Sequence, residues 1–150
     1  MNLSPHFTFA ELIATAHRGI DNTPPAWVVD NLRALCLDVL EPLREVFGPL
    51  HVVSGYRCPE LNVAVGGKPK SQHIQGLAAD VVPLNYSLRK AAPGVLACHA
   101  AEWDQFIYEF GRWLHISAAP GGRPPRREAL MIGSWTGGVE RPLDLAALPD

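Results

Sequence analysis

The feature that most constrains the fold is a long segment, residues 26–47, in which apolar side chains recur every three or four positions. This spacing predicts an α-helix with one apolar stripe, which another layer of the same chain must cover. Gly48 and Pro49 are expected to end this helix, and Pro42 to kink or divide it. The apolar stripe consists of Val28, Leu32, Leu35, Val39, Leu43 and Val46.

The covering layer is predicted from the chain after Pro49, where the apolar pattern changes to that of strands. A hairpin is expected across Gly111 and Arg112, and Thr8 with Glu11 predicts a capping box at the start of an N-terminal helix. A further helix is expected within residues 87–101, interrupted at Pro93-Gly94. The expected strands span residues 50–57, 77–84, 105–110, 113–119 and 129–134, and the N-terminal helix spans residues 8–18.

These elements predict an α+β fold in which N-terminal helices pack on a small, mostly antiparallel sheet. The length of 150 residues suits one hydrophobic core. We expect one domain over residues 1–135, followed by a loosely packed tail over residues 136–150 that forms no separate domain.

Composition excludes some classes of partner before any motif is considered. The formal net charge of −2 gives no electrostatic reason to bind nucleic acid or an anionic membrane. No apolar run is long enough to cross a bilayer. We therefore expect neither nucleic acid nor a membrane as a partner, and we expect a monomer.

Two short stretches carry side chains that could hold a metal ion. The first, SQHIQGLAAD at residues 71–80, contains His73 and Asp80, and the second, WLHIS at residues 113–117, contains His115. On one helix, residues seven apart are about 10 Å apart along the axis, too far to share an ion with bonds of about 2 Å. A loop that turns at Gly76 and enters a strand is compatible with a shared site.

Asp80 offers the strongest physical argument for such a site. It follows two alanines and precedes two valines in an expected strand, where a carboxylate is unfavourable unless it is paired or metal-bound. The alternatives stay open at this point: a strand histidine is often a hydrogen-bonded structural residue, and an aspartate after a glycine often caps a turn. Spacing alone therefore does not decide between a metal site and ordinary polar residues.

The same stretches resemble a known family, the zinc D-Ala-D-Ala carboxypeptidase-like metallopeptidases. SQHIQGLAAD is similar to its S-x-H-x-x-G-x-A-x-D pattern, WLHIS to its W-x-H-x-S strand, and SGYRCPELN at residues 54–62 to the segment that precedes the zinc motif. The N-terminal helical part is similar to that of small phage and prophage members. The resemblance covers roughly residues 7–119, in the family's order.

The resemblance implies a fold shared with the hedgehog signalling domain and one zinc ion (Zn²⁺) per chain, bound by His73, Asp80 and His115. It implies a zinc metallopeptidase that hydrolyses a peptide bond in peptidoglycan stem peptides, either as a D-Ala-D-Ala carboxypeptidase or as an L-alanyl-D-glutamate endopeptidase. Arg57 matches the family's arginine that faces the substrate, and a guanidinium suits a carboxylate or a developing oxyanion.

The general base is where the sequence departs from many members of this family. They carry a carboxylate three residues before the last histidine, but Arg112 stands there and cannot accept a proton. Glu109 matches the position of the glutamate in the hedgehog relatives and is our predicted base, with Asp104 as the second choice. If the hairpin loop has an odd number of residues, Glu109 lies on the face of His115; with a two-residue loop it points away.

Two further residues are expected near the substrate. Ser71 is predicted to contact the ligands or the substrate, or alternatively to cap a turn, and Trp113 is predicted to border the substrate.

Three hypotheses follow from the sequence. The first is the peptidoglycan peptidase. The second is a non-catalytic zinc-bearing module that binds the cell wall or a protein, which the missing carboxylate at Arg112 would allow. The third is a metal-free structural domain. The N-terminus lacks a basic start followed by an apolar run, so no secretory signal is expected. A peptidase of this kind would be made in the cytoplasm and reach the wall after phage lysis or on a virion, or remain a cytoplasmic prophage product.

Overall fold

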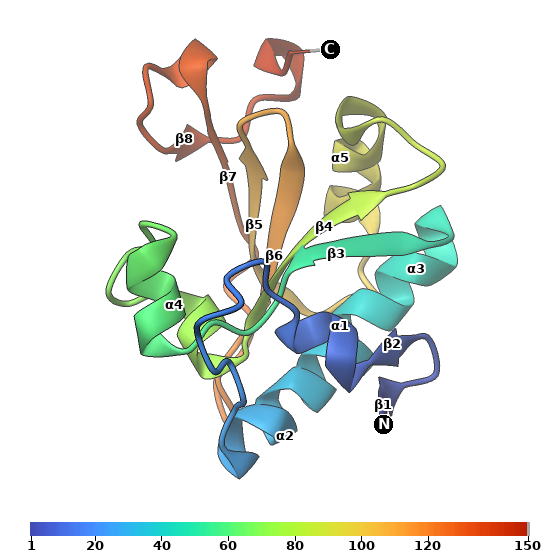
Figure 1. Ribbon diagram of the computed structural model, residues 1–150. Coiled ribbons are helices and arrows are strands. Elements are labelled where there is room, and N and C mark those ends of the chain that lie inside the picture. The colour runs from blue at the N-terminus through green and yellow to red at the C-terminus, as the bar shows by residue number, and fades with distance from the viewer. Residues whose placement is uncertain (150) are drawn as a thin grey trace.

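The computed structural model describes residues 1–149 and has an α+β architecture (Figure 1). A long helix and a six-stranded mixed sheet form its two main layers, which confirms the predicted fold class. The helical elements are α1 (Phe9–Ile13), α2 (Ala26–Leu35), the π-helical η1 (Cys36–Leu40), α3 (Glu41–Phe47), α4 (Pro59–Ala64), α5 (Leu88–Ala97) and the 3₁₀ turns η2 (Gln72–Gln75), η3 (Ser134–Thr136) and η4 (Leu145–Ala147). The strands are β1 (Asn2–Ser4), β2 (Phe7–Thr8), β3 (Leu50–Ser54), β4 (Ala78–Pro83), β5 (Trp103–Glu109), β6 (Trp113–Ala118), β7 (Glu128–Ile132) and β8 (Arg141–Pro142).

The long helix runs without a break from α2 through η1 into α3, and a π-helical turn accommodates Pro42. Proline has no backbone N–H, so the carbonyl group of Asp38 loses its helical partner. The N–H of Glu102 donates to that carbonyl instead, at 2.9 Å. The wider turn also shifts the apolar stripe by one position, because Phe47 is buried while Val46 is 49% exposed. The prediction that Val46 faces the core was therefore wrong.

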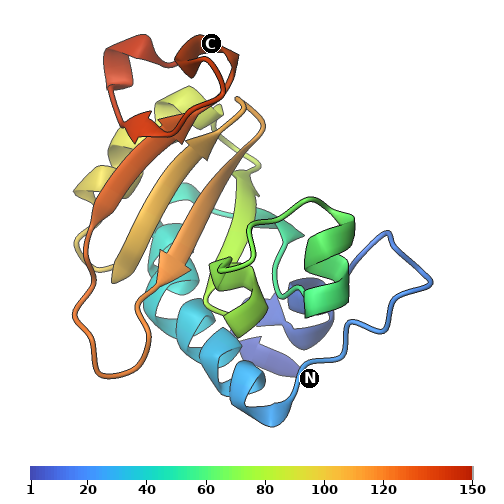
Figure 2. The same ribbon diagram turned by 90° about the vertical axis from the view of Figure 1, so that its left-hand side faces the viewer.

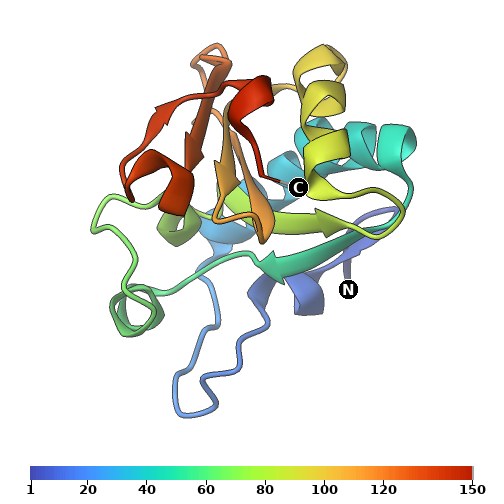
Figure 3. The ribbon, with the colours of Figure 1, turned by 90° about the horizontal axis from the view of Figure 1, so that it is seen from above.

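The sheet has the order β3-β4-β6-β5-β7-β8, and only the β5–β7 pair is parallel. A separate β1–β2 ribbon precedes it, which the sequence did not predict. Figures 2 and 3 show α2, α3 and α5 on one side of the sheet, with α4 on the other. Side chains that point to the helices form the core, including Ala79, Val81, Leu114 and Ile116. The opposite face of these strands is therefore left for polar side chains.

Helix α1 is shorter than predicted, although its capping box between Thr8 and Glu11 is present. The predicted helix over residues 8–18 ends at Ile13 because later parts of the chain bind its last carbonyl groups. The N–H of Tyr56 donates to Leu12 O at 2.7 Å, and the buried Asn22 amide donates to Ile13 O at 2.9 Å. These tertiary contacts replace the continuation of the helix.

Helix α5 also differs from the expectation, and the C-terminal segment makes contacts with the sheet and the core. Pro93-Gly94 does not interrupt α5, and Gly94 lies against the ring of Phe47, where a Cβ would meet that ring at 2.8 Å. Residues 134–149 are largely exposed, but parts of this segment pack on the rest of the fold. Strand β8 pairs with β7, and Leu148 is buried in the core. Within residues 1–149, no helix is both long and apolar enough to cross a lipid bilayer.

The contact between α1 and the segment after β3 yields a test of the fold. A Cβ at Gly55 would overlap the carbonyl oxygen of Leu12, which has little room to move because it is hydrogen-bonded to Tyr56. We expect Gly55→Ala to lower the free energy of unfolding by about 1–3 kcal/mol, measured by denaturant unfolding.

Gly19→Ala is the matched control, because no atom lies within 4 Å of a Cβ built there. Equal stabilities of the two variants would show that the α1 contact is not as close as described.

Candidate metal centre

Asp80 and His115 are brought together by the register of two neighbouring strands. In the antiparallel β4–β6 pair, Asp80 lies directly opposite His115. Side chains opposite one another point to the same face, with Cβ atoms about 5 Å apart. The neighbouring positions in both strands are buried apolar residues that face the helices. Packing of that apolar face fixes the register and therefore places the two polar side chains on the other face.

His73 reaches the same point from the 3₁₀ turn η2, just before β4. The Ser71 hydroxyl oxygen accepts a hydrogen bond from the His73 N–H at 3.2 Å and caps the turn. Gly76 ends the turn with a φ of 70°, a conformation that favours glycine, and lies close to Val28 of the long helix. The turn is thereby held against α2, and the buried His73 ring faces the strands.

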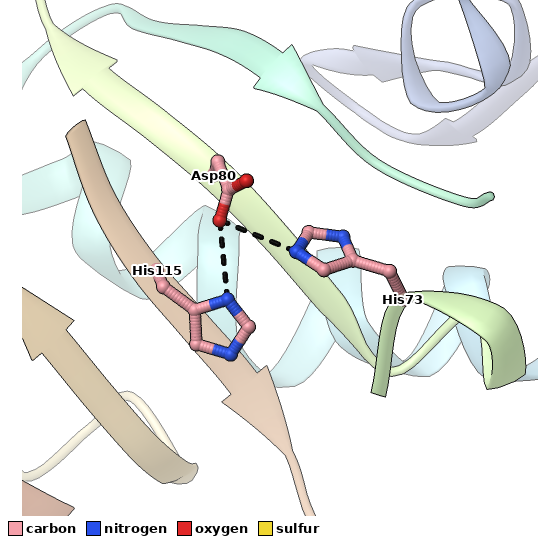
Figure 4. Close-up of side chains that lie close together, drawn as sticks. All are labelled: His73, Asp80 and His115. Carbon is pink, nitrogen blue, oxygen red and sulfur yellow. Dashed lines mark hydrogen bonds and ion pairs between the residues drawn. The ribbon is translucent and has the colours of Figure 1, made fainter. Parts of the chain in front are cut away.

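The three side chains converge on one oxygen atom of Asp80 (Figure 4). Its Oδ1 lies 3.1 Å from Nδ1 of His115 and 3.3 Å from Nε2 of His73. Ligand atoms from all three residues lie within 4.8 Å of one another, and all three residues are buried. Donor atoms that share an ion with bonds of about 2 Å lie about 3–3.5 Å apart, so the observed spacing suits a common metal ion.

The protonation states also suit a metal. Burial lowers the pKa of the His73 imidazole and favours its neutral form. Burial alone would raise the pKa of the Asp80 carboxyl, but His73 and His115 together hold it well below its usual range. Metal ligands must be deprotonated carboxylates and neutral imidazoles. Because the Nδ1–H of His73 is 2.7 Å from the carbonyl oxygen of Gly55, its Nε2 lone pair is directed at Asp80.

These observations test whether the residues fit a metal ion, and they do. Two imidazole nitrogens and one carboxylate oxygen form a donor set typical of catalytic metal sites, which keep a further position for water or substrate. The sequence-predicted residues His73, Asp80 and His115 are therefore a buried group that could hold a metal.

Arg57 lies beside the carboxylate of Asp80. Its Nη2 donates to Asp80 Oδ2 at 3.2 Å, and its Nε donates to the Ser54 hydroxyl at 3.1 Å. Asp80 therefore directs one oxygen to the histidines and the other to Arg57. The guanidinium is fixed in place at the edge of the site.

Glu109 lies on the same face as His115 because the hairpin loop has an odd number of residues. Glu109 pairs with Trp113 across the hairpin, and the loop consists of residues 110–112. The carboxylate Oε1 lies 3.7 Å from His115 Nδ1 and accepts a hydrogen bond from the Trp113 indole N–H at 3.2 Å. Burial raises the pKa of Glu109, and the charge of Asp80 adds to this effect. Trp113 thus orients a carboxylate whose pKa is raised, and this carboxylate lies beside the site.

Asp104, the second choice for a base, is bound by Arg126 and has a structural role. Its carboxylate is fully buried and accepts from Arg126 through the backbone N–H at 2.8 Å and the guanidinium Nη2 at 2.8 Å. Although burial raises the pKa of Asp104, the Arg126 hydrogen bonds hold it below its usual value. Asp104 is therefore an ionised anchor for the loop that contains Arg126.

Gln72 is a contact residue that the sequence did not single out. Its Oε1 lies 3.3 Å from His115 Nε2, and its amide nitrogen lies 3.4 Å from Asp104 Oδ2. It stands in a position that the S-x-H pattern leaves open, so no motif drew attention to it. Only the fold shows that this side chain reaches the second histidine.

A cleft of about 720 Å³ opens onto the trio, a size typical of ligand sites. Residues of the loop after α4 and of the loop before β7 both line it. Except for Asp104, all the site residues predicted from the sequence line it: Arg57, Ser71, His73, Asp80, Glu109, Trp113 and His115.

Comparison with models of protein families places the chain beside known peptidases. Residues 5–117 match the sequence model of a protein family described as Peptidase M15. The match spans the long helix, η2, β4 and most of β6, so it includes His73, Asp80 and His115. No curated protein matches the chain closely enough for comparison.

Metal binding should stabilise the folded chain, because the trio is assembled only by folding. With free metal at 100 times its dissociation constant, the expected gain is about 2.7 kcal/mol in unfolding free energy. Thermal unfolding with and without a divalent metal would measure it. We expect His115→Ala to remove most of this response, whereas His51→Ala, at an exposed position of β3, should retain it. A response in His115→Ala as large as in the unaltered protein would contradict the assignment.

Proposed function

The chain belongs to the peptidase M15 family, and from this premise we propose that it is a zinc-dependent peptidase of bacterial peptidoglycan stem peptides. The observation that carries the proposal is the position of Glu109, 3.7 Å from His115 at the open side of the His73–Asp80–His115 group. A base beside a metal site within a cleft is what metal-assisted peptide hydrolysis requires.

Each of the three buried residues would contribute one atom to the metal site. His73 Nε2, Asp80 Oδ1 and His115 Nδ1 are the atoms that face one another, and they would hold the zinc ion. A bound zinc ion supplies Lewis-acid chemistry, since it lowers the pKa of water and polarises a carbonyl group. The chain's own residues must then position the peptide and move protons.

Glu109 is the proposed proton carrier. Its Oε1 receives a proton from the water whose oxygen bonds to the scissile carbonyl carbon. The carboxyl group then gives that proton to the leaving nitrogen as the C–N bond breaks. The Trp113 indole, which donates to Oε1, keeps the carboxylate turned toward His115. The burial that raises the pKa of Glu109 makes it a stronger base than an exposed glutamate.

Arg57 is the residue that we propose to bind a negatively charged group of the substrate. It lines the cleft, and Ser54 and Asp80 hold its guanidinium in place. Such a fixed fork suits either a carboxylate of the stem peptide or the oxyanion that develops at the scissile carbonyl. Trp113 and Ser71 line the same cleft, and Ser71 acts in addition as the cap that orients His73.

Terminal D-Ala release and L-alanyl-D-glutamate cleavage are the two reactions that fit the proposal. With this substrate, the protein would act at the cell wall after phage lysis or virion delivery, or would remain in the cytoplasm as a prophage product. The experiment that tests the proposal is digestion of purified muropeptides, with products identified by mass spectrometry in the presence and absence of a chelator. We expect chelator-sensitive loss of one amino acid or cleavage of one internal bond. Zinc binding with no cleavage of any stem peptide would favour the non-catalytic module instead.

The role of Glu109 is separable from metal binding. Glu109→Gln keeps the shape of the side chain but cannot take up a proton, so we expect kcat to fall by about 10²–10⁴-fold while bound zinc stays at one per chain. Steady-state kinetics on the cleaved muropeptide and metal analysis of the same sample would measure both.

Glu45→Gln, at an exposed position of α3 on the helical side of the sheet, is the control and should leave turnover unchanged. Full turnover in Glu109→Gln would exclude Glu109 as the base.

A further inference from the structure

A chain of hydrogen bonds links the metal ligand His115 to the loop between β6 and β7. It runs from His115 Nε2 to Gln72 Oε1 at 3.3 Å, and from the Gln72 amide nitrogen to Asp104 Oδ2 at 3.4 Å. Arg126 is the last member of this series, because its Nη2 donates to Asp104 Oδ2 at 2.8 Å. Residues of η2, β5, β6 and the loop before β7 are therefore joined by one series of hydrogen bonds.

The direction of this chain follows from the chemistry of Asp104. Its carboxylate is fully buried, and the hydrogen bonds from Arg126 keep it ionised, so it can only accept hydrogen bonds. The atom of Gln72 that faces Asp104 must then be the NH₂ group, which leaves the amide oxygen facing His115. An oxygen acceptor requires a donor, so His115 Nε2 must carry the proton.

The proton on Nε2 decides which atom of His115 can bind a metal. A neutral imidazole has one protonated nitrogen and one with a lone pair, so protonation at Nε2 leaves the lone pair on Nδ1. Nδ1 is the atom that lies 3.1 Å from Asp80 Oδ1 and faces His73. The carbonyl of Gly55 does the same for His73, with the roles of the two ring nitrogens exchanged.

We propose that Gln72 is a positioning residue that fixes the tautomer and ring orientation of His115, with Asp104 and Arg126 as its anchor. This inference rests on the proposed metal site and adds to it a specific polar support from outside the motif. Partners of this kind typically change metal affinity by about 10–100-fold when they are removed. Arg126 also lines the cleft, so the contact between Arg126 and Asp104 holds part of the cleft wall in place as well.

Gln72→Met tests the proposal, because it keeps an unbranched side chain of similar length but removes both hydrogen bonds. Asp104 retains Arg126, so the variant should fold. We expect zinc to bind about 10–100-fold more weakly, measured by competition with a chromophoric chelator.

Gln75→Met is the matched control at the other end of the same turn. Its backbone carbonyl accepts a hydrogen bond from Asn31, and the substitution leaves that carbonyl in place. Zinc affinity of this variant should equal that of the unaltered protein.

A second readout separates positioning from a general structural effect. In the zinc-loaded protein, the Nε2–H of His115 should give a downfield imidazole proton signal in NMR that exchanges slowly with water. We expect Gln72→Met to lose this signal through exchange, while Gln75→Met keeps it.

Unchanged zinc affinity and an unchanged signal in Gln72→Met would overturn the proposal, as would equal losses in Gln72→Met and Gln75→Met. If the unaltered protein itself binds no zinc, the proposed function fails first, so the two failures are distinguishable.

Discussion

The structure of the candidate site depends on one buried carboxylate. Asp80 is 2% exposed in a strand whose neighbouring positions pack in the core, where an unpaired charge would be strongly destabilising. Two histidines approach one of its oxygens, and Arg57 approaches the other. The turn before β4, the register of β6 and the segment after β3 are each placed so that they satisfy this group. A metal ion shared by Asp80 and the two histidines would complete that arrangement.

Side chains on one face of the sheet stabilise the fold, and side chains on the other face form the candidate site. Ala79, Val81, Leu114 and Ile116 face the long helix and fix the strand register through apolar packing. Because side chains alternate along a strand, the same register presents polar residues on the other face. Stability and site geometry are therefore coupled, although the residues that carry them are different.

Parts of this arrangement could be predicted from the sequence because they depend on local pattern. The apolar period predicted the long helix, and the loop entering a strand predicted how His73 and Asp80 could meet. Other parts depend on tertiary contacts that no local pattern contains. Val46 left the core because a π-helical turn at Pro42 shifted the phase, and α1 ended early because Tyr56 and Asn22 bind its last carbonyl groups.

Within the site, the same distinction holds. Glu109 could be placed only once the length of the hairpin loop was known, since one residue more or less would turn it to the other face. Gln72 could not be predicted, because its partners His115 and Asp104 come from strands that are distant in sequence. Asp104 looked like an alternative base, but its contacts with Arg126 show a carboxylate that is already fully engaged.

The most direct test of the central claim is the location of the metal itself. Crystals of the purified protein, measured on both sides of the zinc absorption edge, would give the anomalous signal of any bound zinc. The account predicts one zinc peak bonded to His73 Nε2, a carboxylate oxygen of Asp80 and Nδ1 of His115, with Glu109 at its open side. A zinc-loaded crystal with no peak between these atoms, or with His115 bound through Nε2, would contradict it.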